Sequence, residues 1–69
     1  MQLSARNQLK GTIKEVKPGT VMAEVVIALP DGQEIVSAIT RSSAERLHLQ
    51  AGDQVVAIIK STEVMVGKE

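Results

Sequence analysis

The sequence contains no cysteine, phenylalanine, tryptophan or tyrosine. Without cysteine, this chain of 69 residues has neither a disulfide framework nor a zinc ribbon to stabilise it. Eight basic residues balance eight acidic ones, so bulk charge offers no means of holding a nucleic acid or an acidic membrane. No apolar run approaches the roughly 20 residues that cross a bilayer, and no charged-then-apolar leader opens the chain. We therefore expect a soluble, cytoplasmic protein without redox activity.

The length indicates a single domain over residues 1–69. Ordering such a chain costs about 100 kcal/mol, and domains below about 70–80 residues rarely offset that cost with their own core. The usual supplements are missing, because the sequence has no disulfide, no evident structural metal and no large aromatic side chain. Burial of apolar surface between subunits is the remaining way to offset the cost of ordering the chain, so we expect an obligate homo-oligomer.

Strand-forming residues dominate the composition. Nineteen positions are valine, isoleucine or threonine, which favours pleated backbone. Turn signals at Lys17-Pro18-Gly19, Pro30-Asp31-Gly32 and Ala51-Gly52-Asp53 divide the chain. The strands predicted between them span residues 3–16, 21–29, 34–39, 54–60 and 61–66. The sequence therefore predicts an all-β domain with one short helix, in the order β-β-β-α-β-β.

The helix is expected after the third of these strands. Ser42-Ser43-Ala44-Glu45 has the spacing of a capping box, which satisfies two amide donors at a helix start. Ala44, Leu47 and His48 then share one side of the helix.

Two of the predicted strands are apolar on both faces. Residues 21–29 are apolar at every position except Glu24, and residues 55–59 are apolar throughout. A sheet with one solvated side alternates apolar and polar residues instead. The second face therefore needs another subunit to cover it, in agreement with the argument from size.

Enzymatic chemistry has little support in the sequence. A Ser-His-Asp arrangement could in principle be assembled from Ser42 or Ser43, His48 and Asp53. Serines at a helix start followed by a histidine are far more often caps and helix-face residues. The carboxylates and the single histidine are not spaced as metal ligands. We expect no catalysis and no cation site.

A small barrel with a helix between its third and fourth strands suggests the oligonucleotide-binding architecture. That fold binds single strands by stacking bases on aromatic rings over a basic groove. This chain has neither the rings nor the net positive charge, so the fold analogy comes without the nucleic-acid site.

Two segments carry the donors that a tetrahedral oxyanion requires. Ser4-Ala5-Arg6-Asn7 provides a hydroxyl, a guanidinium and an amide, and Lys60-Ser61-Thr62 provides an ammonium and two hydroxyls. Convergent N–H and O–H donors with one or two fixed positive charges are the means by which proteins hold such anions. On spacing alone, an oxyanion site and an ordinary solvated rim of the sheet both remain open.

The stretch from Ser4 to Ile13, Ser-Ala-Arg-Asn-Gln-Leu-Lys-Gly-Thr-Ile, resembles the opening signature of the molbindins. These are small molybdate-binding proteins, also called Mop proteins, of the TOBE domain type. The likeness continues through Ile39-Thr40, Leu49-x-x-Gly52-Asp53-x-Val55 and residues 59–64, and so covers nearly the whole chain.

The resemblance implies a five-stranded barrel similar to the oligonucleotide-binding fold, dimerised by strand exchange and assembled as a hexamer, a trimer of dimers. It implies molybdate or tungstate bound at subunit interfaces, with no cofactor. Carried over by position, the ligand residues would be Ser4, Arg6, the amides around Ala5, Thr40, Lys60 and Ser61, with Asn7 and Thr62 in second rank.

The function that follows from this resemblance is intracellular storage of molybdenum as its oxyanion. The alternative is a stand-alone sensing domain that acts on a transporter or a transcription regulator. Binding of sulfate or another oxyanion, and an oligomer with a vestigial pocket, are further alternatives.

Overall fold

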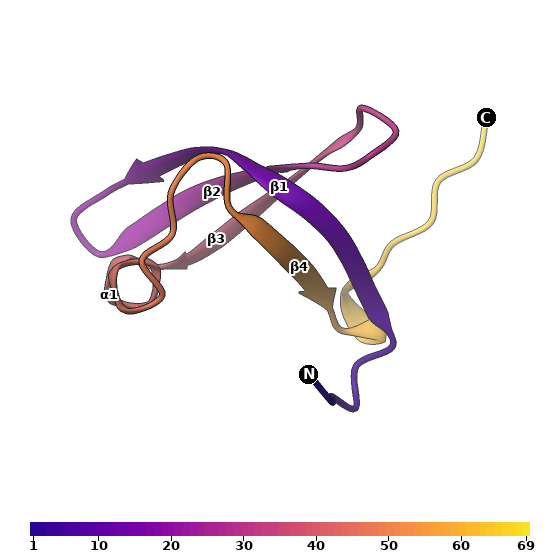
Figure 1. Cartoon of the computed structure of the whole chain (residues 1–69). Helices are drawn as coiled ribbons and strands as arrows, with labels where there is room; N and C mark the ends of the chain where they lie inside the picture. Colours follow the sequence, from indigo (N-terminus) through magenta and orange to yellow (C-terminus); the bar gives the residue numbers. More distant parts are fainter.

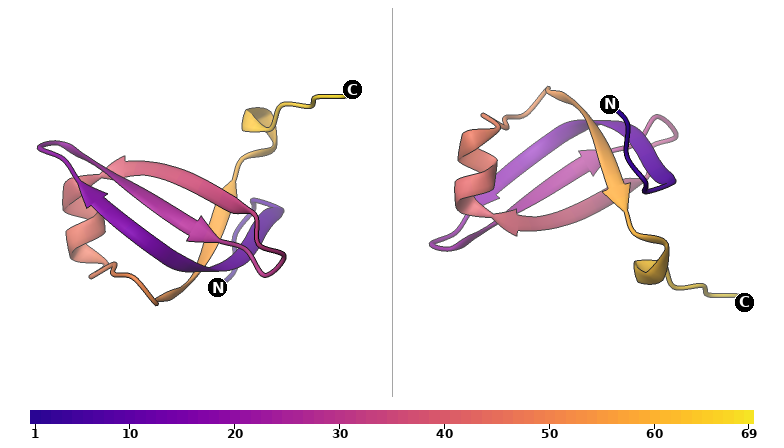
Figure 2. Two further views of the ribbon diagram at one scale, coloured as in Figure 1. Left: turned by 90° about the horizontal axis from the view of Figure 1, so that it is seen from above. Right: turned by 90° about the horizontal axis from the view of Figure 1, so that it is seen from below.

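The computed structural model describes residues 1–69 and consists of one antiparallel sheet, one short helix and a 3-10 turn. The four strands are β1 (Asn7–Pro18), β2 (Met22–Ala28), β3 (Glu34–Thr40) and β4 (Gln54–Ile59). Helix α1 (Arg41–Arg46) follows β3, and the 3-10 helix η1 (Ser61–Glu63) follows β4. The sheet has the strand order β3-β2-β1-β4 and curls into half a barrel (Figure 1; Figure 2). The prediction of a mostly β domain with one short helix is confirmed.

Strand β1 is long enough to pair with two neighbours in succession. Its first half pairs with β4, from Asn7 opposite Ile59 to Thr12 opposite Gln54, and its second half pairs with β2. The register against β2 shifts between Ile13 and Glu15, which makes Lys14 a bulged residue. A bulge bends its strand and increases the local twist, and the sheet curls at this point.

Gly11 allows the close approach of strands that the curl requires. A Cβ atom at this position would lie 2.6 Å from Cγ2 of Ile27 and 2.7 Å from the carbonyl oxygen of Ala28. Both distances are shorter than van der Waals contact, so a side chain here would push β1 away from β2.

The core lies on the concave face of the sheet. It is built around Ile13, Val25, Ile27 and Ala57, and no buried position is polar or charged. Within the apolar stretch 21–29, Ala23, Val25 and Ile27 are buried at the centre of β2. Val21 is 70% exposed because the strand begins only after it.

The helix begins two residues earlier than the predicted capping box. Its N-cap is Thr40, whose Oγ1 accepts a hydrogen bond from the amide of Ser43 at 3.1 Å. Glu45 does not close a box with Ser42; its carboxylate instead accepts from Nε of Arg41 at 2.7 Å. The capping box at Ser42 is therefore wrong, because the threonine at the end of β3 caps the helix first.

The helix ends in a Schellman motif in which His48 takes the left-handed position. The amide of Leu49 donates to the carbonyl of Ala44 and the amide of His48 donates to that of Glu45, the two bonds that define this motif. His48 has φ 54°, the only positive value outside glycine. The predicted place of His48 on the helix face is wrong, since the helix stops before it.

Two predicted strand segments are not strands in this chain. Residues 61–66, predicted as a fifth strand, form η1 and then continue as Val64–Glu69 without any strand pairing. The first strand begins at Asn7 rather than at residue 3. A strand requires a neighbour for its amides and carbonyls, and β4 ends at Ile59 while the segment after η1 leads away from the sheet (Figure 1).

Candidate functional site

The two segments singled out as oxyanion donors leave the sheet from neighbouring strand ends. Asn7 pairs with Ile59 at the last position of the β1–β4 ladder, so Ser4–Asn7 and Lys60–Thr62 continue outward from adjacent strand ends. In Figure 2 the N-terminal segment and η1 both lie at the end of the sheet away from α1. We call these two segments, 4–7 and 60–62, the open end of the sheet.

Arg6 and Lys60 are the cations of the open end. One position beyond the last pair, the register would place Arg6 opposite Lys60, and like charges facing each other across two strands are destabilising. Neither takes part in an ion pair, and neither do Lys10, Arg46 and Lys68, but only Arg6 and Lys60 are neighbours across the end of a ladder. Two neighbouring cations without a carboxylate partner leave positive charge for an anion to neutralise.

Neutral donors lie in the same two segments as these cations. Ser4, Ser61 and Thr62 are exposed and make no side-chain hydrogen bond, and the amides of Ser61 and Thr62 have no acceptor in the chain. The segment before β1 is held in a bend because Nε2 of Gln8 donates to the carbonyl of Ala5 at 2.7 Å. Asn7 is half-buried as the first residue of β1.

Thr40 lies at the opposite end of the sheet. It pairs with Met22 at the start of β2, beyond the far end of β1. The 12 residues of β1 span roughly 36 Å of strand at about 3.3 Å per residue, so one chain does not bring Thr40 to Arg6 and Lys60. Its hydroxyl is already engaged, since it accepts from the amide of Ser43 and donates to Oγ of Ser43 at 2.7 Å.

A shallow hollow of about 400 Å³ lies beside Thr40. It is lined by Thr20, Val21, Thr40, Arg41, Ser42 and Glu45. Nη1 of Arg41 donates to the carbonyl of Gly19 at 3.3 Å and its Nε to Glu45, so the charge of this arginine is largely satisfied within the chain. We call Thr40 and α1 the helix end of the sheet; it offers hydroxyl groups and little free charge.

The residues of a Ser-His-Asp arrangement do not assemble. Ser43 is bonded to Thr40, Oδ2 of Asp53 accepts from the amide of Gln50 at 3.0 Å, and no hydrogen bond joins either of them to His48. No three His, Cys, Asp or Glu side chains are grouped so that they could hold a metal ion. No helix is long and apolar enough to cross a membrane.

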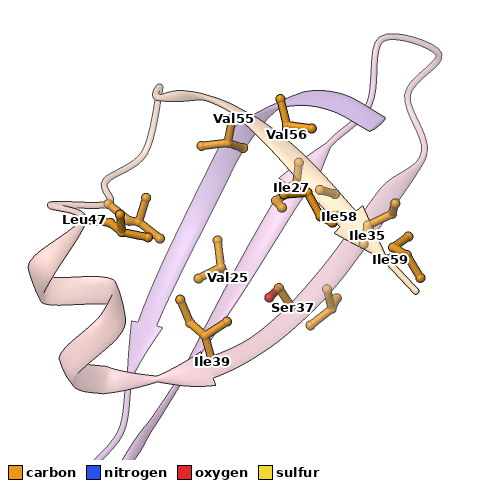
Figure 3. Close-up of a pocket in the computed structure, with 13 residues that line it drawn as sticks. Val25, Ile27, Ile35, Ser37, Ile39, Leu47, Val55, Val56, Ile58 and Ile59 are labelled. Carbon is orange, nitrogen blue, oxygen red and sulfur yellow. The ribbon is translucent and has the colours of Figure 1, made fainter. Parts of the chain in front are cut away.

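An apolar groove of about 460 Å³ opens between β3 and β4 (Figure 3). Of its 13 lining residues 12 are hydrophobic, and Ser37 is the exception. The uncovered apolar face on residues 55–59 was predicted from the sequence, but the side of the groove that Ile35 and Ile39 form was not. Their alternation with Ser37 along the third strand was the available signal.

Two ionisable groups with shifted pKa values, Lys14 and Asp31, lie outside both ends of the sheet. A hydrogen bond from Lys14 to Glu34, reinforced by the charge of Glu34, raises the pKa of Lys14. Hydrogen bonds from Gln33 to the carboxylate lower the pKa of Asp31 in the turn between β2 and β3. Neither shift marks a catalytic group.

A curled β-sheet with one capping helix, an apolar groove and a cationic open end defines a small ligand-binding domain. The chain belongs to the TOBE domain family, whose model matches residues 3–66. It is 47% identical over 66 residues to molybdenum-pterin-binding protein 3 of Clostridium pasteurianum, covering 96% of this chain and 97% of that protein.

Solved structures agree with this assignment. The chain superposes with a TM-score of 0.92 on a molybdate-binding protein from Sporomusa ovata, at 47% identity and over 99% of this chain and all of that one. It superposes with a TM-score of 0.84 on ModG, a cytoplasmic molybdate-binding protein solved with molybdate bound, at 46% identity and over 88% of this chain and 43% of that one.

Proposed function

We propose that the protein binds molybdate, and tungstate as its near-isostere, between the open end of one subunit and the helix end of another. The observation that carries the proposal is the pair of neighbouring, unpaired cations Arg6 and Lys60 at the end of the β1–β4 ladder. Thr40 is too distant within one chain, so a second subunit would have to supply it. Both named relatives with solved structures are molybdate-binding proteins.

Charge and hydrogen bonding together account for the choice of ligand. Two cations nearly neutralise a dianion, while Ser4, the amides around Ala5 and the hydroxyl of Ser61 would orient its oxygens. Asn7 and Thr62 border the same site and are secondary candidates as ligand residues. None of these side chains is a carboxylate, so a protonated anion such as hydrogen phosphate meets only neutral hydroxyl and amide acceptors, which are weaker than a charged one. The longer bonds of molybdate distinguish it from sulfate by size.

The ligand is proposed to be the bare oxyanion rather than a pterin, although the name of the Clostridium relative includes one. A pterin is a flat heteroaromatic ring that needs several fixed polar partners and a stacking surface. The groove of this protein offers only Ser37 as a polar residue, and the chain has no aromatic side chain.

The assembly is proposed to complete the barrel by strand exchange. The groove lies between the unpaired edges of β3 and β4, and Val64, Met65 and Val66 are 51%, 94% and 93% exposed. An apolar segment of a second copy in this groove would supply the fifth strand, and three such dimers would form a hexamer.

Within the cell we propose storage of molybdenum in the cytoplasm, without catalysis. The Clostridium relative is matched over 97% of its own length, so a domain of this size stands alone there. The compartment follows ModG, which is described as cytoplasmic.

Native mass spectrometry tests this proposal, with molybdate, tungstate and sulfate added separately to the purified protein. We expect a hexamer that takes up molybdate and tungstate and little or no sulfate. Arg6→Glu should abolish uptake and leave the oligomer intact, because it places negative charge against the anion. Lys10→Glu, a change of the same sign at an exposed position in the middle of the β1–β4 ladder and outside both ends, should bind as the wild type does. An oligomer indifferent to all three anions would overturn the proposal.

Mixing two variants tests whether the site spans two chains. Arg6→Ala lacks the open end and Thr40→Ala lacks the helix end, so each alone should bind weakly. A mixed oligomer contains some interfaces at which both intact ends meet, and it should recover part of the uptake. If mixing recovers nothing, the two ends do not share a site.

A further inference from the structure

The turn η1 joins the candidate anion site directly to the apolar C-terminal segment. Lys60 is extended, with φ −64° and ψ 139°, and Val64 is extended again, with φ −90° and ψ 119°. The three residues between them therefore make the whole change of direction after β4 (Figure 1). We call Val64–Val66 the arm.

The direction of the arm depends on very few interactions within the chain. The turn is closed by the amide of Glu63 donating to the carbonyl of Lys60 at 2.9 Å and by the amide of Val64 donating to that of Ser61 at 3.3 Å. Met65 and Val66 make no hydrogen bond and are almost fully exposed. Both bonds have their acceptor on Lys60 or Ser61, so a ligand that holds these two residues acts on the turn that sets the direction of the arm.

We propose that anion binding at Lys60 and Ser61 fixes this turn and so secures the arm against the neighbouring subunit. This inference rests on the proposed function and assigns to the same site control over the contact between subunits. A ligand shifts a conformational equilibrium only by its different affinity for the two states. Here the difference arises because the side chains of Lys60 and Ser61 converge on one anion only for one geometry of the turn. By linkage, a docked arm must in turn raise the affinity for the anion.

Hydrogen–deuterium exchange of the full-length oligomer tests the first half of this coupling. Protein is held at one concentration without anion, with molybdate and with sulfate, and exchange is followed in the peptide that contains the arm. We expect molybdate to slow exchange in the arm about tenfold, within the usual range of such couplings, and sulfate to have little effect. Amides of β2 serve as the internal reference and should not change.

The affinity of an arm variant tests the second half. The double variant Val64→Thr, Val66→Thr keeps the shape and strand propensity of the arm but makes it polar. It should bind molybdate about tenfold more weakly by titration calorimetry, at a concentration where native mass spectrometry shows the oligomer intact. Gly67→Thr introduces the same residue just beyond the arm and should bind as the wild type does.

The outcomes separate this inference from the function on which it rests. If molybdate binds the wild type but leaves exchange in the arm unchanged, or if the arm variant binds as tightly as the wild type, the coupling is absent and the binding function stands. If molybdate does not bind the wild type, the proposed function fails and the coupling fails with it.

Discussion

The two ends of this sheet differ in whether their polar groups find partners within the chain. At the helix end, Thr40 caps α1, Arg41 is held by Glu45 and by the carbonyl of Gly19, and the Schellman motif closes the helix. At the open end, Arg6 and Lys60 have no ion-pair partner and the chain leaves the sheet after β4. One end satisfies its polar groups within the chain, and the other exposes them.

This difference indicates where stability and binding reside. Polar groups that are already bonded contribute to folding and lose something when a ligand recruits them. Free donors and unpaired cations contribute nothing to folding and are available to a ligand. Substitutions at the helix end should therefore change stability first, and substitutions at the open end should change binding first.

The largest effect is expected from placing a charge in the core between the two ends. Val25 is 2% exposed at the centre of β2, and a buried unpaired charge costs more than about 3 kcal/mol. Val25→Asp should abolish folding and assembly, as judged by circular dichroism and size-exclusion chromatography. Val21→Asp, at a position 70% exposed, is the control and should remain folded. A soluble, full-sized oligomer of Val25→Asp would show that this face is not buried.

A pair of threonines compares the two ends directly. Thr40→Ala removes a helix cap and should cost about 1 kcal/mol, or roughly 4–8 °C in the melting temperature of a domain this small. Thr62→Ala removes a hydroxyl that makes no hydrogen bond in the chain, so it should leave the melting temperature unchanged and weaken anion binding slightly. Thermal unfolding at one protein concentration measures both, and equal losses of stability would contradict the comparison.

Relief of backbone strain at the helix end should give a smaller effect of opposite sign. His48 occupies a left-handed position that glycine adopts without penalty. His48→Gly should raise stability by a few tenths of a kcal/mol up to about 1 kcal/mol, since the greater freedom of glycine in the unfolded chain offsets part of the gain. Gly52→Ala, at φ 96°, is the converse change and should destabilise. Denaturant unfolding resolves the two directions.

The smallest effect is expected from the turn between β2 and β3, which belongs to neither end. The pKa of Asp31 lies below its ordinary 3.8 because Gln33 donates to its carboxylate. Its contribution is therefore present above the unfolded pKa and is lost as the pH falls through the lower, folded pKa. Asp31→Asn should lower the melting temperature slightly near neutrality, and the difference from the wild type should shrink as the pH falls below the ordinary pKa of 3.8, so that the slope against pH is flatter there. An unaltered slope would mean that other carboxylates account for it.

The sequence predicted the elements that depend on local chemistry. Pro30-Asp31-Gly32 and Ala51-Gly52-Asp53 marked turns that the structure confirms, and the strands they bound are placed to within one or two residues. The start of the helix was harder, since Thr40 and Ser42 are both good caps and only tertiary structure decides between them. The segment 61–66 was misassigned because an apolar, β-branched stretch predicts a strand whether or not its partner lies in the same chain.

The candidate site, like the fold, could be predicted only in part from the sequence. Residue types alone identified Ser4–Asn7 and Lys60–Thr62 as oxyanion donors, but nothing in their spacing connects positions so far apart in the chain. The β1–β4 register makes that connection. The participation of Thr40 rests on the family resemblance, and it stays a prediction because it requires a second subunit.

The bulge at Lys14 also determines which side chains of β1 point into the core on either side of it. Before it, odd-numbered residues of β1 such as Ile13 point into the core, and after it the even-numbered Val16 does so. If Lys14 were paired as in a regular strand, Ile13 and Val16 would point to opposite faces of the sheet, and the first half of β1 would be turned over relative to the second. Arg6 would then face the other side of the sheet from its present position. The one extra residue in β1 thus determines on which face of the sheet the charge of Arg6 lies.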